Sequence, residues 1–176
     1  MEFYLSSNSL KQVKESGVEE DFKLRIFDNT INCSTFVALF ISKQISQNYR
    51  NDPTIREFNF SFPTTSTFYN NRSELKNMIE HANFITKFNN FLTGSSIQIE
   101  EEKEGEIKDN DKSKNLETAK LIIEFGKVLK NEEMIEKGLN FLYLNDLSDE
   151  KSAINSIKVL QTLKDFDYPQ NPEQIY

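Results

Sequence analysis

The chain has 176 residues, of which 37% are hydrophobic and 28% charged, a composition typical of one soluble globular domain. Its formal net charge is −7, which argues against nucleic acid or an anionic membrane as a partner, because phosphates and acidic lipids repel such a chain. A single cysteine, Cys33, excludes a disulfide within the chain and indicates a reducing compartment, cytoplasmic or nuclear. No apolar run approaches the ~18 residues of a membrane helix, and the first residues lack the pattern of a secretory signal.

Three short strands are predicted in the first third of the chain. Residues 22–26 alternate apolar and charged side chains, which predicts a half-buried strand. Residues 27–30 include Asp and Asn, which tolerate left-handed backbone, so we expect a tight turn there and a return strand over 31–33. Residues 58–62 alternate again and stop at a proline, which predicts a third strand.

Two consecutive helices are predicted between the second and third strands. Ser34 or Thr35 is expected to cap the first helix. All of residues 36–41 are apolar, which predicts a fully buried element. Ser42 is expected to cap a second, mostly polar helix that ends before Pro53.

The middle of the chain is predicted to be helical with a bend. We expect Ser73 to cap a helix whose apolar stripe bends at Asn83 and ends at Gly94. Residues 96–100 alternate briefly, which predicts a short extra strand.

An acidic stretch interrupts this pattern. Residues 100–114, EEEKEGEIKDNDKSK, are nearly all charged and are expected to form a disordered loop inside the domain. Beyond it, Asn115, Asn131 and Ser148 are expected to cap three amphipathic helices.

Several of these segments resemble the BTB/POZ family. The similar stretches are CSTFVALFIS, FNNFLTGSSIQI and LETAKLIIEFGKVLKNEEMIEKGLNFL, and the predicted order of strand, hairpin, two helices and strand is similar too. The segment DNTINCSTFVALFISKQISQ is most similar to the corresponding segment of divergent BTB-like proteins of trichomonad-type protists.

The resemblance implies a fold and a division of the chain. It implies an α+β fold, with a small three-stranded sheet and a short extra strand covered by a cluster of helices. The BTB/POZ-like domain is expected over residues 22–145. Residues 1–21 then form a lead-in with at most a short helix, and residues 146–176 form the start of a C-terminal helical extension, cut short here.

The resemblance also implies a function. Family members are adaptors that dimerise, and many join a cullin-type ubiquitin ligase, so we expect protein partners, a homodimer and a cullin as one candidate. The family commonly has His where this chain has Ser34. Its cullin-contacting helix usually ends in an apolar-x-Glu triplet, where this chain has Asn48, Tyr49 and Arg50. With Ile45, these three residues form the predicted partner-binding surface.

No catalytic motif is predicted. His81 is the only histidine and Cys33 the only cysteine, and the five glycines form no phosphate-binding loop. We therefore expect a non-enzymatic protein with no cofactor and no metal. Two alternatives stay open: a self-association scaffold with no ubiquitin role, and a small regulatory domain that uses the acidic residues 100–106.

Overall fold

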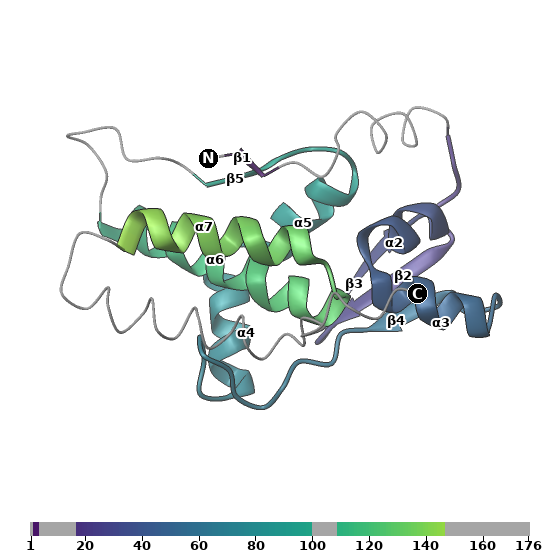
Figure 1. Cartoon of the computed structure of the whole chain (residues 1–176), viewed down its shortest axis with the longest axis horizontal. Helices are drawn as coiled ribbons and strands as arrows, with labels where there is room; N and C mark the ends of the chain where they lie inside the picture. Colours follow the sequence, from purple (N-terminus) through teal and green to yellow (C-terminus); the bar gives the residue numbers. More distant parts are fainter. Residues whose placement is uncertain (1, 4–16, 100–108, 147–176) are drawn as a thin grey trace, which may run out of the picture.

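A three-stranded sheet lies near the start of the chain (Figure 1), in a computed structural model that describes residues 2–3, 17–99 and 109–146. Strand β2 (Phe22–Ile26) pairs antiparallel with β3 (Asn29–Cys33) and parallel with β4 (Glu57–Asn59), so the order is β3-β2-β4. The described residues also form six helices. The predicted α+β class with a small three-stranded sheet is therefore confirmed.

The strand predictions hold best for β2. Its side chains alternate between buried and exposed along all five residues, because one face packs on the core and the other meets solvent. The return strand starts at Asn29, two residues earlier than predicted, and Phe27, with φ of 52°, takes the left-handed backbone in the turn. Strand β4 is shorter than the predicted 58–62, although the Phe60 amide still donates to the Arg25 carbonyl at 2.8 Å.

The first helix, α2 (Thr35–Ile41), corrects a prediction. Its cap is Ser34, one of the two predicted, and its side chains Val37, Ala38 and Ile41 are buried. Phe36 and Phe40, however, are 52% and 46% exposed, so the prediction of a fully buried helix is wrong. The sheet and the neighbouring helices cover only one side of this short helix, and the opposite side is apolar and open.

The next three helices begin with side-chain caps or a backbone break. Helix α3 (Lys43–Asn51) has the predicted cap, Ser42. Helix α4 (Arg72–His81) is capped by Asn71 rather than by the predicted Ser73. Asn83, with φ of 50°, separates α4 from α5 (Phe84–Leu92), which confirms the predicted bend.

Helices α6 (Asp109–Leu129) and α7 (Glu132–Asp146) form an antiparallel pair beside the sheet (Figure 1). Because α6 begins at Asp109, the predicted disordered loop over 100–114 is wrong for its last six residues; residues 100–108 lie outside the described part. The two helices approach closely where Gly138 faces Ile123, since a Cβ atom at Gly138 would lie 2.6 Å from the Ile123 Cγ1 atom.

Phenylalanine rings join the sheet to these helices. Phe125 of α6 lies at the centre, with ring centroids 4.7 to 5.2 Å from those of four other rings. These rings belong to Phe60, Phe62, Phe84 and Phe88. The cluster connects the segment after β4, α5 and α6 in one core.

A second, two-stranded sheet pairs distant parts of the chain. Strand β5 (Ile97–Gln98) corresponds to the predicted short extra strand, and it pairs antiparallel with β1 (Glu2–Phe3), which was not predicted. The predicted lead-in helix and residues 147–176 of the predicted extension lie outside the described residues. No described helix combines the length and the apolar character that crossing a membrane requires.

Candidate interaction surface

Two stacked phenylalanine rings on α2 form an exposed apolar surface, which we call the α2 face (Phe36 and Phe40). Four residues apart on a helix, the two side chains lie on the same side, and their ring centroids are 6.3 Å apart with planes inclined by 15°. The helix, TFVALFI, contains no charged residue. Single exposed apolar side chains are common; two adjacent exposed rings with no charge between them form a continuous apolar patch, which makes this side of α2 the candidate contact surface.

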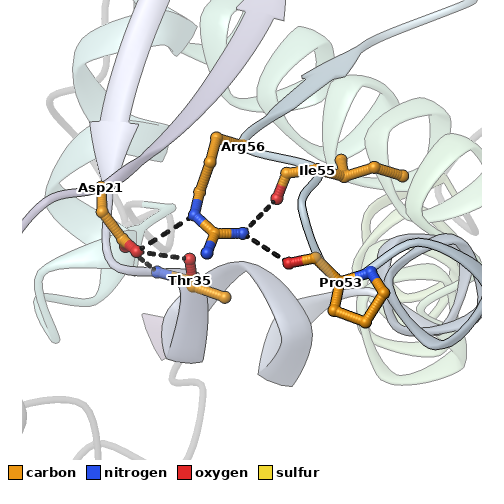
Figure 2. A network of polar contacts seen from close by, with 5 residues as sticks. All are labelled: Asp21, Thr35, Pro53, Ile55 and Arg56. Atoms are coloured by element: carbon orange, nitrogen blue, oxygen red, sulfur yellow. Dashed lines mark hydrogen bonds and ion pairs between the residues drawn. The ribbon is translucent and has the colours of Figure 1, made fainter.

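Asp21 fixes the start of α2 (Figure 2). Its Oδ1 accepts a hydrogen bond from the Thr35 amide at 2.7 Å, and its Oδ2 accepts one from the Thr35 hydroxyl at 2.9 Å. The bond from the Thr35 amide is the main reason why the pKa of Asp21 lies below its usual range. Ser34 accepts from the Val37 amide at 3.2 Å, so two of the free amides at this helix end have acceptors.

Arg56 extends this network to the loop between α3 and β4 (Figure 2). Its Nη1 donates to the carbonyls of Pro53 and Ile55, both at 2.8 Å, and its Nε lies 3.6 Å from the Asp21 Oδ2. The guanidinium also lies 5.8 Å from the centroid of the Tyr49 ring. The loop and the start of α2 are therefore held together.

The other end of α2 is tied to the turn between α6 and α7. The Ser42 hydroxyl donates to the Leu129 carbonyl at 2.8 Å, and the Asn131 side-chain amide donates to the Ile41 carbonyl at 2.8 Å. Both ends of α2 are therefore bonded to other elements, so the helix backbone that carries the two phenylalanines is anchored, and binding a partner need not pay the entropy of ordering that backbone.

The structure does not bring all four predicted site residues to one surface. Ile45 is fully buried and belongs to the core, so it has no surface for a partner. Asn48 and Tyr49 are half-buried, and Arg50 is exposed. Asn48 accepts a hydrogen bond from Gln44 at 3.0 Å, so the outer side of α3 is polar.

Sequence reasoning missed Phe36 and Phe40. Their four-residue spacing was visible, but the equally apolar residues between them suggested burial on every side. The available signal was the length of the helix. Seven residues make only about two turns, and the rest of the chain need not cover such a short helix on every side.

The two candidate catalytic side chains do not lie in a catalytic arrangement. Cys33 is 5% exposed, and burial, with Glu20 and Asp21 adding to it, raises its pKa to about 12, so its thiol stays protonated at neutral pH. His81 lies on α4, with its Nδ1 atom 2.6 Å from the Glu117 Oε2 on α6. Within the described part of the chain, no three His, Cys, Asp or Glu side chains form a group that could hold a metal. Residues 100–106 lie outside it.

Comparisons with protein-family models, with curated proteins and with solved structures find no match for this chain. The basis for a functional assignment is therefore the sequence resemblance together with the α2 face.

Proposed function

We propose that this chain is a non-enzymatic protein-interaction module of the BTB/POZ type that self-associates through the α2 face. The observation that carries the proposal is the exposed and stacked pair of Phe36 and Phe40. The order of strand, hairpin, two helices and strand is also the order that the resemblance implied. The free Cys33 thiol favours a reducing location, cytoplasmic or nuclear.

A second copy of the chain suits this surface chemically. In a twofold contact the same patch meets itself, and because α2 has no charged residue, no like charges are brought together where the two α2 helices meet. Each ring has roughly 100 Å² exposed, so four rings bury roughly 400 Å², compared with about 1,200 Å² for a stable interface. Surfaces that flank α2 must therefore contribute to the dimer.

The molar mass in solution tests the proposal. We expect light scattering after size exclusion to give twice the 20.6 kDa of one chain for the wild type and the single-chain mass for Phe40→Glu. Gln47→Glu is the matched control, since it adds the same charge at an exposed position of α3 and should leave the dimer intact. A wild type that is monomeric at about 100 μM, or a dimer that persists in the Phe36→Glu/Phe40→Glu double variant, contradicts the proposal.

A narrower role, as the adaptor of a cullin-type ubiquitin ligase, rests on the resemblance. Binding of the purified chain to the N-terminal region of a cullin tests it directly. Absence of binding at micromolar concentrations removes the cullin and leaves a self-association scaffold with no ubiquitin role.

A further inference from the structure

Residues 63–71, which we call the strap, form a loop between the aromatic cluster and α4. Before it, Phe62 is buried among the aromatic rings, and its last residue, Asn71, caps α4. The Arg72 Nη2 atom donates to the Phe62 carbonyl at 3.1 Å, which ties the two ends of the loop to each other. A loop with joined ends has the geometry of an Ω-loop, so its middle can move while its ends stay in place.

Hydrogen bonds within the strap join its own residues. The Ser66 amide donates to the Tyr69 carbonyl at 2.9 Å, and the Ser66 hydroxyl oxygen accepts from the Phe68 amide at 3.0 Å. The Tyr69 hydroxyl donates to the Pro63 carbonyl at 3.0 Å. These bonds can persist when the strap moves away from the rest of the protein, so the strap is suited to open as one local unit.

A buried carboxylate lies against the strap. Glu124 of α6 is 1% exposed, and no other Asp, Glu, Lys or Arg side chain among the described residues is buried. Burial and, after it, the negative charge of Glu124 raise the pKa of the Tyr69 hydroxyl to about 12. The ion-pair partner of Glu124, Lys127, has its Nζ atom 5.4 Å from the centroid of the Phe68 ring. Both members of the ion pair are therefore next to strap residues.

The Glu124 carboxylate is only partly satisfied by the protein. Its Oε1 atom accepts a hydrogen bond from the Lys127 ammonium group at 2.9 Å, whereas its Oε2 atom accepts none from any described residue. A buried carboxylate with too few donors raises the free energy of the closed state, and contact with water lowers it again. Opening the strap would supply the missing donors from solvent.

We propose that the strap opens as a unit to hydrate Glu124, and that Lys127 keeps it closed by neutralising this carboxylate. The two partners have unequal roles. The Lys127 side chain is 25% exposed, so without Glu124 its ammonium group can still reach solvent, whereas Glu124 without Lys127 is an uncompensated buried charge. Opening exposes Phe68 and Tyr69. This conformational device is separate from the α2 face and goes beyond the proposed self-association.

Hydroxyl-radical footprinting tests the proposal, because the rate at which a side chain is oxidised reports its exposure. Tyr69 reports the strap, and Phe22 of β2, which is fully buried, reports unfolding of the whole domain. For Lys127→Met we expect Tyr69 to be oxidised at least about fivefold faster than in the wild type, with Phe22 unchanged. Lys137→Met is the matched control, since it breaks the more exposed ion pair with Glu133 on α7 and should leave Tyr69 unchanged.

Removing the buried charge separates the proposal from two simpler explanations. Glu124→Met and the Glu124→Met/Lys127→Met double variant have no charge to hydrate, so Tyr69 should be oxidised at the wild-type rate in both. If Lys127 held the strap through the Phe68 ring, the double variant would open as much as Lys127→Met. If the ion pair were a symmetrical clasp, Glu124→Met would open the strap as well. Either result overturns the proposal.

Lys127→Gln guards against a variant that does not fold. Glutamine keeps a hydrogen-bond donor near Glu124 but no charge, so the oxidation rate of Tyr69 should lie between those of the wild type and Lys127→Met. An unchanged Tyr69 rate in both Lys127 variants overturns the proposal. Oxidation of Phe22 together with Tyr69 in both variants also overturns it, because the charge would then be hydrated by unfolding of the domain rather than by opening of the strap.

Discussion

Phe125→Ala should destabilise this protein more than a typical substitution, because its ring is the meeting point of four others. The ring is fully buried, and its centroid lies 4.7 to 5.2 Å from those of Phe84, Phe60, Phe88 and Phe62. Replacing a buried Phe by Ala costs about 3–5 kcal/mol, and each aromatic pair contributes about 0.5–1.5 kcal/mol beyond its buried area, with sums that are not additive. We therefore expect a loss of about 4–5 kcal/mol, a large part of the 5–15 kcal/mol that is typical of a domain.

Urea unfolding followed by circular dichroism measures this loss, and Phe36→Ala is the matched control. The same atoms are deleted from a ring that is 52% exposed, so the loss should stay below about 1 kcal/mol. If the α2 face binds a second copy, the Phe36→Ala loss should grow as the protein concentration is raised, whereas the Phe125→Ala loss should not. A difference between the two variants smaller than about 1.5 kcal/mol at low concentration would refute the central role of Phe125, given the expected costs.

Three further predictions follow from contacts elsewhere. Gly138→Ala should lower the free energy of unfolding by about 1–2 kcal/mol, because the overlap with Ile123 costs more than the gain in helix propensity; an unchanged urea midpoint would contradict this. The pKa of Asp21 is lowered on folding by its bond from Thr35, so its carboxylate stabilises the fold above the ordinary value of 3.8 and loses this contribution as the pH falls through the folded pKa. The stability advantage of wild type over Asp21→Asn should accordingly shrink on acidification below 3.8, and an advantage that grows would have the wrong sign. Cys33, with its pKa raised to about 12, should react with iodoacetamide at pH 8 at least about a hundredfold more slowly in the native state than in urea; comparable rates would show that the thiol is accessible.

Much of the local structure was predictable because it depends on neighbours in the sequence. The alternation in residues 22–26 defines β2, and the caps Ser34 and Ser42 begin the helices that they were expected to begin. The bend at Asn83 follows from a residue type that tolerates left-handed backbone.

Some predictions were wrong where the local sequence was compatible with two conformations. Ser73 and Asn71 can both cap α4, and the structure uses Asn71, with Glu74 folding back to accept from the Asn70 amide at 2.8 Å. Likewise, the mostly charged residues 109–114 were expected to be disordered, yet they are helical and form the first turns of α6.

The candidate site, the α2 face, was not predicted from the sequence. The sequence placed a partner surface on α3, but Ile45 faces the core, and the exposed apolar residues are Phe36 and Phe40 one helix earlier. Periodicity shows which residues share a side of a helix, but it does not show which apolar side the rest of the chain covers.

By itself, the sequence determined the α+β class, the paired strands at residues 22–33 and most helix starts, because period, turn residues and caps act over a few positions. Only the tertiary structure decided that one side of α2 is uncovered and that β3, among the described strands, is an outer strand of its sheet. Both features depend on which elements pack beside α2 and β3, and those elements come from residues far away along the chain.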